Sequence, residues 1–101
     1  YDMDETSYRE SQLCRVLGNP KAYQILMEIQ RLGEATPTQL SKRVNRSVST
    51  VCGHLRSLRE SQLVRFLKTE TGTTYRAKPP GIPGLQKQLR RVVNEVRRLE
   101  N

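Results

Sequence analysis

Two helix-start signals lie close together in the middle of the chain, and their spacing limits the fold more than any other feature. Thr36-Pro37-Thr38-Gln39 is a capping box with proline at the first helical position, and Ser47 is an N-cap residue shortly after it. The first helix must therefore be short, and Asn45-Arg46 supplies the turn to the second. Two helices joined by a turn of about three to four residues form a helix-turn-helix unit.

Two further helices are predicted before this unit. Ser7-Tyr8-Arg9-Glu10 predicts a capping box at the start of the first helix, and Gly18-Asn19-Pro20 ends it. Asn19 then caps the second helix, which has Pro20 at its first position and stops at Gly33. Each helix has an apolar face, made of Tyr8, Leu13, Val16 and Leu17 in the first and of Ala22, Ile25, Leu26, Ile29 and Leu32 in the second.

The helix that follows Ser47, predicted at about residues 48–62, has two contrasting faces. At about 100° per residue, Val51, Leu55 and Leu58 share one face, which must pack on the preceding helices. The opposite face carries Ser49, Gly53, Arg56 and Glu60. Small side chains let the backbone approach DNA closely, and Arg56 can then reach a base edge or a phosphate.

Two β-rich runs come next, at residues 63–69 and 73–78, on either side of Glu70-Thr71-Gly72. They predict a β-hairpin that forms a wing beside the helix-turn-helix. Side chains alternate between the two faces of a strand, so apolar and basic residues should separate. One face would carry Val64, Phe66, Tyr75 and Ala77, and the other Arg65, Thr74, Arg76 and Lys78. Such a ribbon can lie along the sugar-phosphate backbone or place an arginine in the minor groove.

The end of the chain has an apolar repeat. After a linker at residues 79–84, rich in Pro and Gly, a helix is expected at residues 85–101. Its apolar residues alternate at spacings of four and three: Leu85, Leu89, Val92, Val96 and Leu99. A repeat of this length makes only a weak coiled coil on its own. We therefore expect the last helix to pack with the first helix, through Tyr8 and Leu13, in an interface between two copies of the chain. The alternative is a helix folded against its own domain.

The formal net charge of +8 is concentrated in one part of the chain. Residues 42–78 contain nine Lys and Arg residues against only Glu60 and Glu70, whereas residues 1–10 are acidic. Clustered cations bind polyanions because they release counterions from phosphate. Nucleic acid is the expected partner, ahead of an anionic membrane surface. Because the chain has neither a spanning apolar run nor a signal peptide, it is expected in the cytoplasm.

The stretch TPTQLSKRVNRSVSTVCGHLRSLRESQLVRFLKTETGTTYRAKP resembles the winged helix-turn-helix of ArsR-type bacterial and archaeal repressors. The likeness rests on S-T-V-x-x-H-L-x-x-L-x-x-x-x-L-V, here Ser49 to Val64, followed by a wing ending in Tyr75, and it covers about residues 13–78. It implies a mostly α-helical fold with a small β-hairpin, flanked by N- and C-terminal dimerisation helices. It also implies a homodimeric transcription regulator whose second helix-turn-helix helix enters the major groove.

Several positions depart from the family pattern. Cys52 stands where the family usually has serine, and Gln62 where it has glycine before Leu-Val. Lys21-Ala22-Tyr23 lacks the arginine that commonly follows the Asn-Pro of the entry helix. The motif of the metal-sensing members is absent too, because residues 38–44 contain no Cys, His, Asp or Glu. We therefore expect no metal and no other cofactor, and the effector stays unknown.

Cys52 and His54 are metal-ligand types, but their spacing argues against a shared ion. Side chains two apart on a helix point about 200° away from each other, whereas chelation needs spacings of three or four. His54 lies beside the apolar face, where we expect it to hydrogen-bond near the wing. Cys52 is a contact residue at the DNA edge, a packed thiol or a redox switch. Cys14 should be a small core hydrophobe, although two such thiols across a dimer leave a disulfide sensor open.

No enzyme is indicated. The chain has one histidine, no nucleophile with a neighbouring base and no glycine loop that cradles phosphate. We predict a sequence-specific transcriptional regulator that binds a pseudo-palindromic operator in double-stranded DNA as a homodimer. The alternatives are a redox- or ligand-responsive sensor that uses Cys14 and Cys52, and a winged-helix module that binds protein or RNA.

The predicted organisation has four parts: an acidic tail and first helix at 1–18, the winged helix-turn-helix at 19–78, the linker at 79–84 and the dimerisation helix at 85–101. The expected DNA-binding residues are Thr38, Arg46, Ser47, Ser49, Thr50, Cys52, Gly53, Arg56, Lys68, Thr73, Arg76 and Lys78. Ser47 is included because the free amides at a helix start favour phosphate oxygens.

Overall fold

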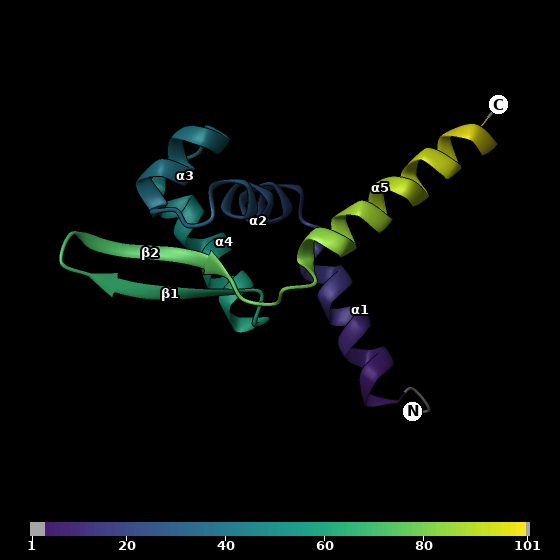
Figure 1. Ribbon diagram of the computed structural model, residues 1–101, viewed down its shortest axis with the longest axis horizontal. Coiled ribbons are helices and arrows are strands. Elements are labelled where there is room, and N and C mark those ends of the chain that lie inside the picture. Colours follow the sequence, from purple (N-terminus) through teal and green to yellow (C-terminus); the bar gives the residue numbers. More distant parts are fainter. Residues whose placement is uncertain (1–3, 101) are drawn as a thin grey trace.

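The computed structural model describes residues 4–100, which form five helices and one β-hairpin. The elements are α1 (Glu5–Leu17), α2 (Pro20–Leu32), α3 (Pro37–Val44), α4 (Val48–Glu60), β1 (Val64–Thr69), β2 (Gly72–Ala77) and α5 (Ile82–Leu99). Figure 1 places α3, α4 and the hairpin at one end of the molecule, and α1 and α5 at the other. The predicted class, mostly α with a small hairpin in a winged helix-turn-helix, is confirmed.

Local capping explains where most of the helices begin. The Asn19 side chain accepts from the amides of Lys21 and Ala22, and Thr36 and Gln39 form the reciprocal capping box. The predicted start of α1 was wrong, because Asp4 is its N-cap and accepts from the Ser7 amide at 2.8 Å. A carboxylate interacts more strongly than a hydroxyl with the positive end of the helix dipole, which favours Asp4 over Ser7.

The turn between α3 and α4 depends on Asn45. This residue has φ 55° and ψ 52°, the left-handed conformation that asparagine tolerates better than most residues. The amides of Asn45 and Arg46 both donate to the Ser41 carbonyl, and the Ser41 hydroxyl donates to the Arg46 carbonyl. Ser47 then caps α4 by accepting from the Thr50 amide, so the predicted turn and cap are confirmed.

Helix α2 lies at the centre of a wholly apolar core. It buries Ala22, Ile25, Leu26 and Ile29 against α3, α4 and the hairpin. Helix α4 contributes Val51, Leu55 and Leu58, each with no exposed surface, as predicted. In the described part of the chain, no polar or charged residue is buried. Burial of each large aliphatic side chain stabilises the fold by roughly 1.5–3 kcal/mol, which sets the orientation of α4 on the domain.

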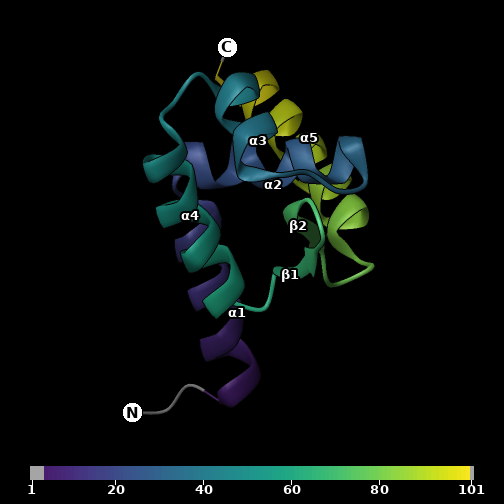
Figure 2. The ribbon, with the colours of Figure 1, turned by 90° about the vertical axis from the view of Figure 1, so that its left-hand side faces the viewer.

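The hairpin is antiparallel, and within residues 4–100 only β2 is also hydrogen-bonded on its outer edge. Val64 pairs with Ala77, Arg65 with Arg76, and Phe66 with Tyr75, so the predicted separation of apolar and basic residues is confirmed at the base of the hairpin. Toward the tip, Leu67 falls on the basic face and Lys68 on the apolar face. On the other edge of β2, Tyr75 exchanges two backbone hydrogen bonds with Ala35, at 3.0 and 2.8 Å. Figure 2 looks along the hairpin from its tip, with α4 to one side of it.

Helix α5 begins at Ile82, three residues earlier than the sequence indicated. Pro83 lies in its first turn, where the missing N–H costs no hydrogen bond, so the Pro/Gly composition of residues 82–84 does not exclude a helix. Ile82 is buried in the core and anchors the helix. Beyond this anchor, α5 projects away from the domain (Figure 1).

Candidate nucleic-acid interface

The outward face of α4 is small, polar and free of the core. Ser49, Cys52, Gly53 and Arg56 are all exposed, while the buried residues of α4 hold the opposite side of the helix against α2 and α3. Gly53 has no heavy atom from another part of the chain near its missing Cβ, so the backbone is open to close approach there. A helix presented in this way can enter a major groove.

The start of α4 carries a small hydrogen-bond network. The Ser47 hydroxyl accepts from the Thr50 amide at 3.1 Å and donates to Thr50 Oγ1 at 2.9 Å. The hydroxyl proton of Thr50 is therefore left to donate outward. The remaining amides of the first turn have no partner within the helix, so they are available to an acceptor such as a phosphate oxygen.

The wing brings two cations face to face. Arg65 and Arg76 are cross-strand partners, both exposed and on the same face of the hairpin. Like charges directly opposite each other destabilise a hairpin. A bound anion between them removes this repulsion, so the pair is suited to a phosphate.

An arginine of α4 holds the wing against this helix. The Arg59 guanidinium carbon lies 4.8 Å from the centroid of the Phe66 ring, and that ring packs at 6.2 Å on Tyr75. Such a cation–π contact contributes about 0.5–1 kcal/mol at an exposed site. This contact was not predicted from the sequence. The sequence indicates only that Arg59 lies on the same side of the helix as Cys52, seven residues earlier.

The basic residues of this end are not neutralised by the chain. Within residues 4–100 the ion pairs are Arg9–Glu5, Arg31–Glu28 and Arg91–Glu95, and none of them lies on α3, α4 or the wing. At the pair on α2, the hydrogen bond and charge of Glu28 raise the pKa of Arg31. Among the described residues, the basic side chains around α4 and the wing have no such carboxylate partner, so their positive charge is available to an external polyanion.

The predicted DNA-binding residues outside α4 lie on α3, in the turn before α4 and on the wing. Thr38 is exposed in the first turn of α3, and Arg46 in the turn before α4. Lys68 and Thr73 are partners near the tip of the hairpin. Lys78 lies instead at the base of the wing, where its ammonium donates to the Gln62 side chain, so it is set apart from the residues at the tip.

The two thiols and the histidine do not form a metal site. Both Cys14 and Cys52 are exposed, so the predicted core position of Cys14 was wrong, and of the three alternatives for Cys52 the packed thiol is excluded in the single chain. His54 is half-buried, and the predicted side-chain hydrogen bond is not seen within residues 4–100. The same residues contain no group of three or more His, Cys, Asp or Glu that could hold an ion.

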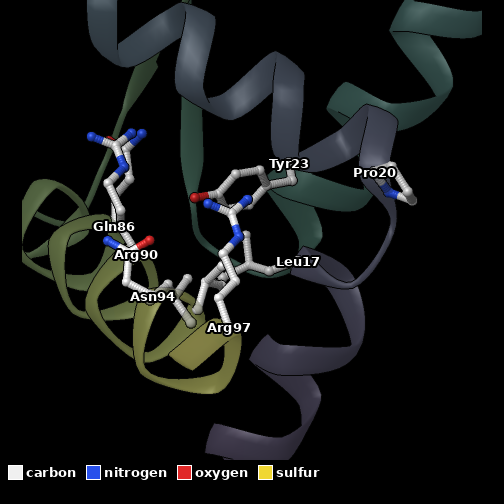
Figure 3. Close-up of a pocket in the computed structure, with 9 residues that line it drawn as sticks. Leu17, Pro20, Tyr23, Gln86, Arg90, Asn94 and Arg97 are labelled. Carbon is white, nitrogen blue, oxygen red and sulfur yellow. The ribbon is translucent and has the colours of Figure 1, made fainter. Parts of the chain in front are cut away.

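The other end of the molecule exposes an apolar stripe along α5. Leu85, Leu89, Val92, Val96 and Leu99 are all exposed, as is Tyr8 on α1, whereas Leu13 is half-buried. Beside this stripe lies an open groove of about 570 Å³ between α5 and the junction of α1 with α2. Figure 3 shows Arg97 extending from α5 toward Tyr23 across this groove, whose apolar lining includes Leu17 and Val93.

In the described residues, no helix has the length and apolarity to cross a membrane.

Residues 19–65 match the sequence model described as bacterial regulatory protein, arsR family. No curated protein sequence matches the chain. Among solved structures, HlyU from Vibrio cholerae N16961 is similar, with a TM-score of 0.78 and 26% identity over 89% of this chain and 97% of HlyU. An ArsR-like transcriptional regulator from Rhodococcus sp. RHA1 has a TM-score of 0.70 and 24% identity, covering 96% of this chain and 92% of its own.

A third similar structure is described as the homodimeric winged helix-turn-helix DNA-binding domain Mb0332 from Mycobacterium bovis, a possible ArsR-family transcriptional regulator. It has a TM-score of 0.73 and 22% identity, over 94% of this chain and 90% of that domain. The fold is thus that of winged helix-turn-helix transcriptional regulators.

Proposed function

From the match of residues 19–65 to the arsR family model, we propose that the chain is a sequence-specific transcriptional regulator that binds double-stranded DNA as a homodimer. Helix α4 enters the major groove, and the wing follows the backbone or enters the minor groove. The observation that carries the proposal is the outward face of α4: small side chains beside unpaired arginines, held rigidly by a buried opposite face.

The contacts divide into those that position the protein and those that read sequence. Ser47, with the free amides at the start of α4, and the Arg65–Arg76 pair are suited to phosphates. Ser49, Thr50 and Arg56 are the side chains assigned to base edges, because α4 presents them where a major groove would lie. Thr38, Arg46, Lys68 and Thr73 extend the contact to neighbouring phosphates.

The second copy is assigned to the apolar stripe of α5. A helix with this many exposed aliphatic side chains is unfavourable in water, and covering them by an identical helix and by α1 relieves that cost. The groove beside α5 supplies further apolar surface at the same place. The homodimeric state of the Mb0332 domain supports the assignment.

The experiment that tests the proposed function is selection of bound sites from random duplex DNA, followed by footprinting of the selected site. Two recognition helices related by a dyad must enter successive major grooves, so half-sites should lie about 34–36 Å apart, one helical turn. The selected sequence should be pseudo-palindromic. Recovery of a single asymmetric half-site, or of no preferred sequence, would count against the proposal.

The wing should contribute affinity without specificity. Arg65→Ala and Arg76→Ala should weaken binding to all sequences by similar factors, because phosphate contacts carry no base information. Each lost contact should reduce the slope of log K against log salt by about 0.9. Binding to the selected site and to random duplex is measured over a series of salt concentrations, with Arg9→Ala on α1 as the control. A changed base preference would reassign the wing as a direct reader.

A further inference from the structure

Val48 is an exposed aliphatic residue in the first turn of the recognition helix. Its side chain is 43% exposed, directly after the capping Ser47 and among residues that are otherwise mostly polar or very small. A β-branched side chain lowers helix propensity slightly, and 43% of this residue's surface stays uncovered in the single chain. Neither helix propensity nor core packing therefore requires a valine here.

Val48 does not stand alone on the helix. At about 100° per residue, Cys52 lies one turn further on and about 40° around from Val48, and its thiol is also exposed. Arg59 continues the same stripe at the C-terminal end of α4, where it stacks on Phe66, so the stripe borders the outward face of α4 on the side of the wing. Val48 and Cys52 thus form a short apolar strip beside the polar residues Ser49 and Arg56.

The chemistry of the major groove gives such a strip one natural partner. Thymine is the base that presents an apolar group there, its C5 methyl, whereas the other base edges present hydrogen-bond donors and acceptors. The methyl groups of valine offer no hydrogen bond, and a thiol offers only a weak one. An apolar strip at the start of a groove-entering helix is therefore matched to a methyl group and mismatched to a polar base edge.

We propose that Val48, with Cys52 beside it, is a specificity-determining residue that reads thymine through its C5 methyl group. This inference rests on the proposed binding of DNA by α4. The preferred half-site then contains thymine at the position that the start of α4 faces. Removing one methyl from a contact of this kind should weaken binding about four-fold, from the transfer free energy of one buried methyl or methylene group.

The test replaces each thymine of the selected site in turn by deoxyuridine, which removes only the C5 methyl. In the unchanged protein, at least one substitution per half-site should weaken binding about four-fold. In Val48→Ser the same substitution should have no effect. Leu67→Ser, a change at an exposed aliphatic residue of the wing, should leave the four-fold effect intact. Circular dichroism establishes that each variant is folded, and Cys52→Ser provides a second variant on the strip.

The outcomes separate this inference from the proposed function. If a pseudo-palindromic site is selected but no thymine is sensitive, or the sensitivity persists in both Val48→Ser and Cys52→Ser, the thymine contact is wrong and sequence-specific binding stands. If no sequence is selected at all, the proposed function fails first and this inference fails with it.

Discussion

A variant that carries both Val92→Glu and Val96→Glu is expected to be a monomer and to lose specific binding to a two-half-site operator. Both valines lie on the exposed stripe of α5, 53% and 47% exposed in the single chain, so the domain itself should still fold. Facing a second copy, however, four carboxylates would enter one apolar interface, where unpaired charge is costly. Loss of the linked second half-site should lower operator affinity by about 10²- to 10⁴-fold.

Sedimentation gives the mass of this variant, and thermal unfolding reports whether the domain is intact. Lys87→Glu with Arg98→Glu is the matched control, because it alters the charge of the same helix on its other side and should leave the dimer in place. An unchanged dimer mass in the valine variant would remove α5 from the interface. Helix α5 would then be assigned to another role.

Arg56→Ala is expected to weaken binding to the preferred site by about 1–3 kcal/mol. The difference in affinity between the preferred site and random DNA should become smaller. Arg56 is exposed, has no ion pair within residues 4–100, and lies mid-helix, where alanine is well tolerated. The loss should therefore be confined to DNA, with no change in thermal stability. Affinities for the selected site and for random duplex are measured at one salt concentration. They give the loss of binding to the selected site and the ratio of specific to non-specific affinity.

Arg59→Ala, three residues further along the same helix, is the comparison. It removes the contact with Phe66, so it should loosen the wing and weaken binding to both DNAs together. If Arg56→Ala instead lowers both affinities equally, Arg56 is a phosphate contact and sequence is read elsewhere on α4.

Local signals in the sequence predicted most of the helices correctly because their causes are local. The caps at Asn19, Thr36 and Ser47 each involve side chains within three residues of the amides they satisfy. The errors at α1 and α5 arose where two local signals compete. Asp4 and Ser7 are both good caps, and a Pro/Gly pair is compatible with both a linker and a first helical turn.

Contacts between elements were harder to predict. Cys14 adjoins apolar residues in sequence, but the apolar residues of α1 that pack on the core are Leu13, Val16 and Leu17, and Cys14 is exposed. The Arg65–Arg76 and Arg59–Phe66 contacts depend on the strand register and on the angle between α4 and the hairpin. Both are tertiary properties that no short stretch of sequence contains.

The paired hydrogen bonds between Ala35 and Tyr75 give the wing a graded stiffness along its length. An isolated two-stranded hairpin is marginally stable in water, but here β2 is supported on both edges at Tyr75 and on only one edge beyond it. Amide hydrogens near Tyr75 and Val64 should therefore exchange slowly, and those between Lys68 and Thr73 quickly. In the proposed complex with DNA, a stiff base would keep Arg65 and Arg76 in register with α4, and a compliant tip would let Lys68 follow a groove whose width changes with the DNA sequence.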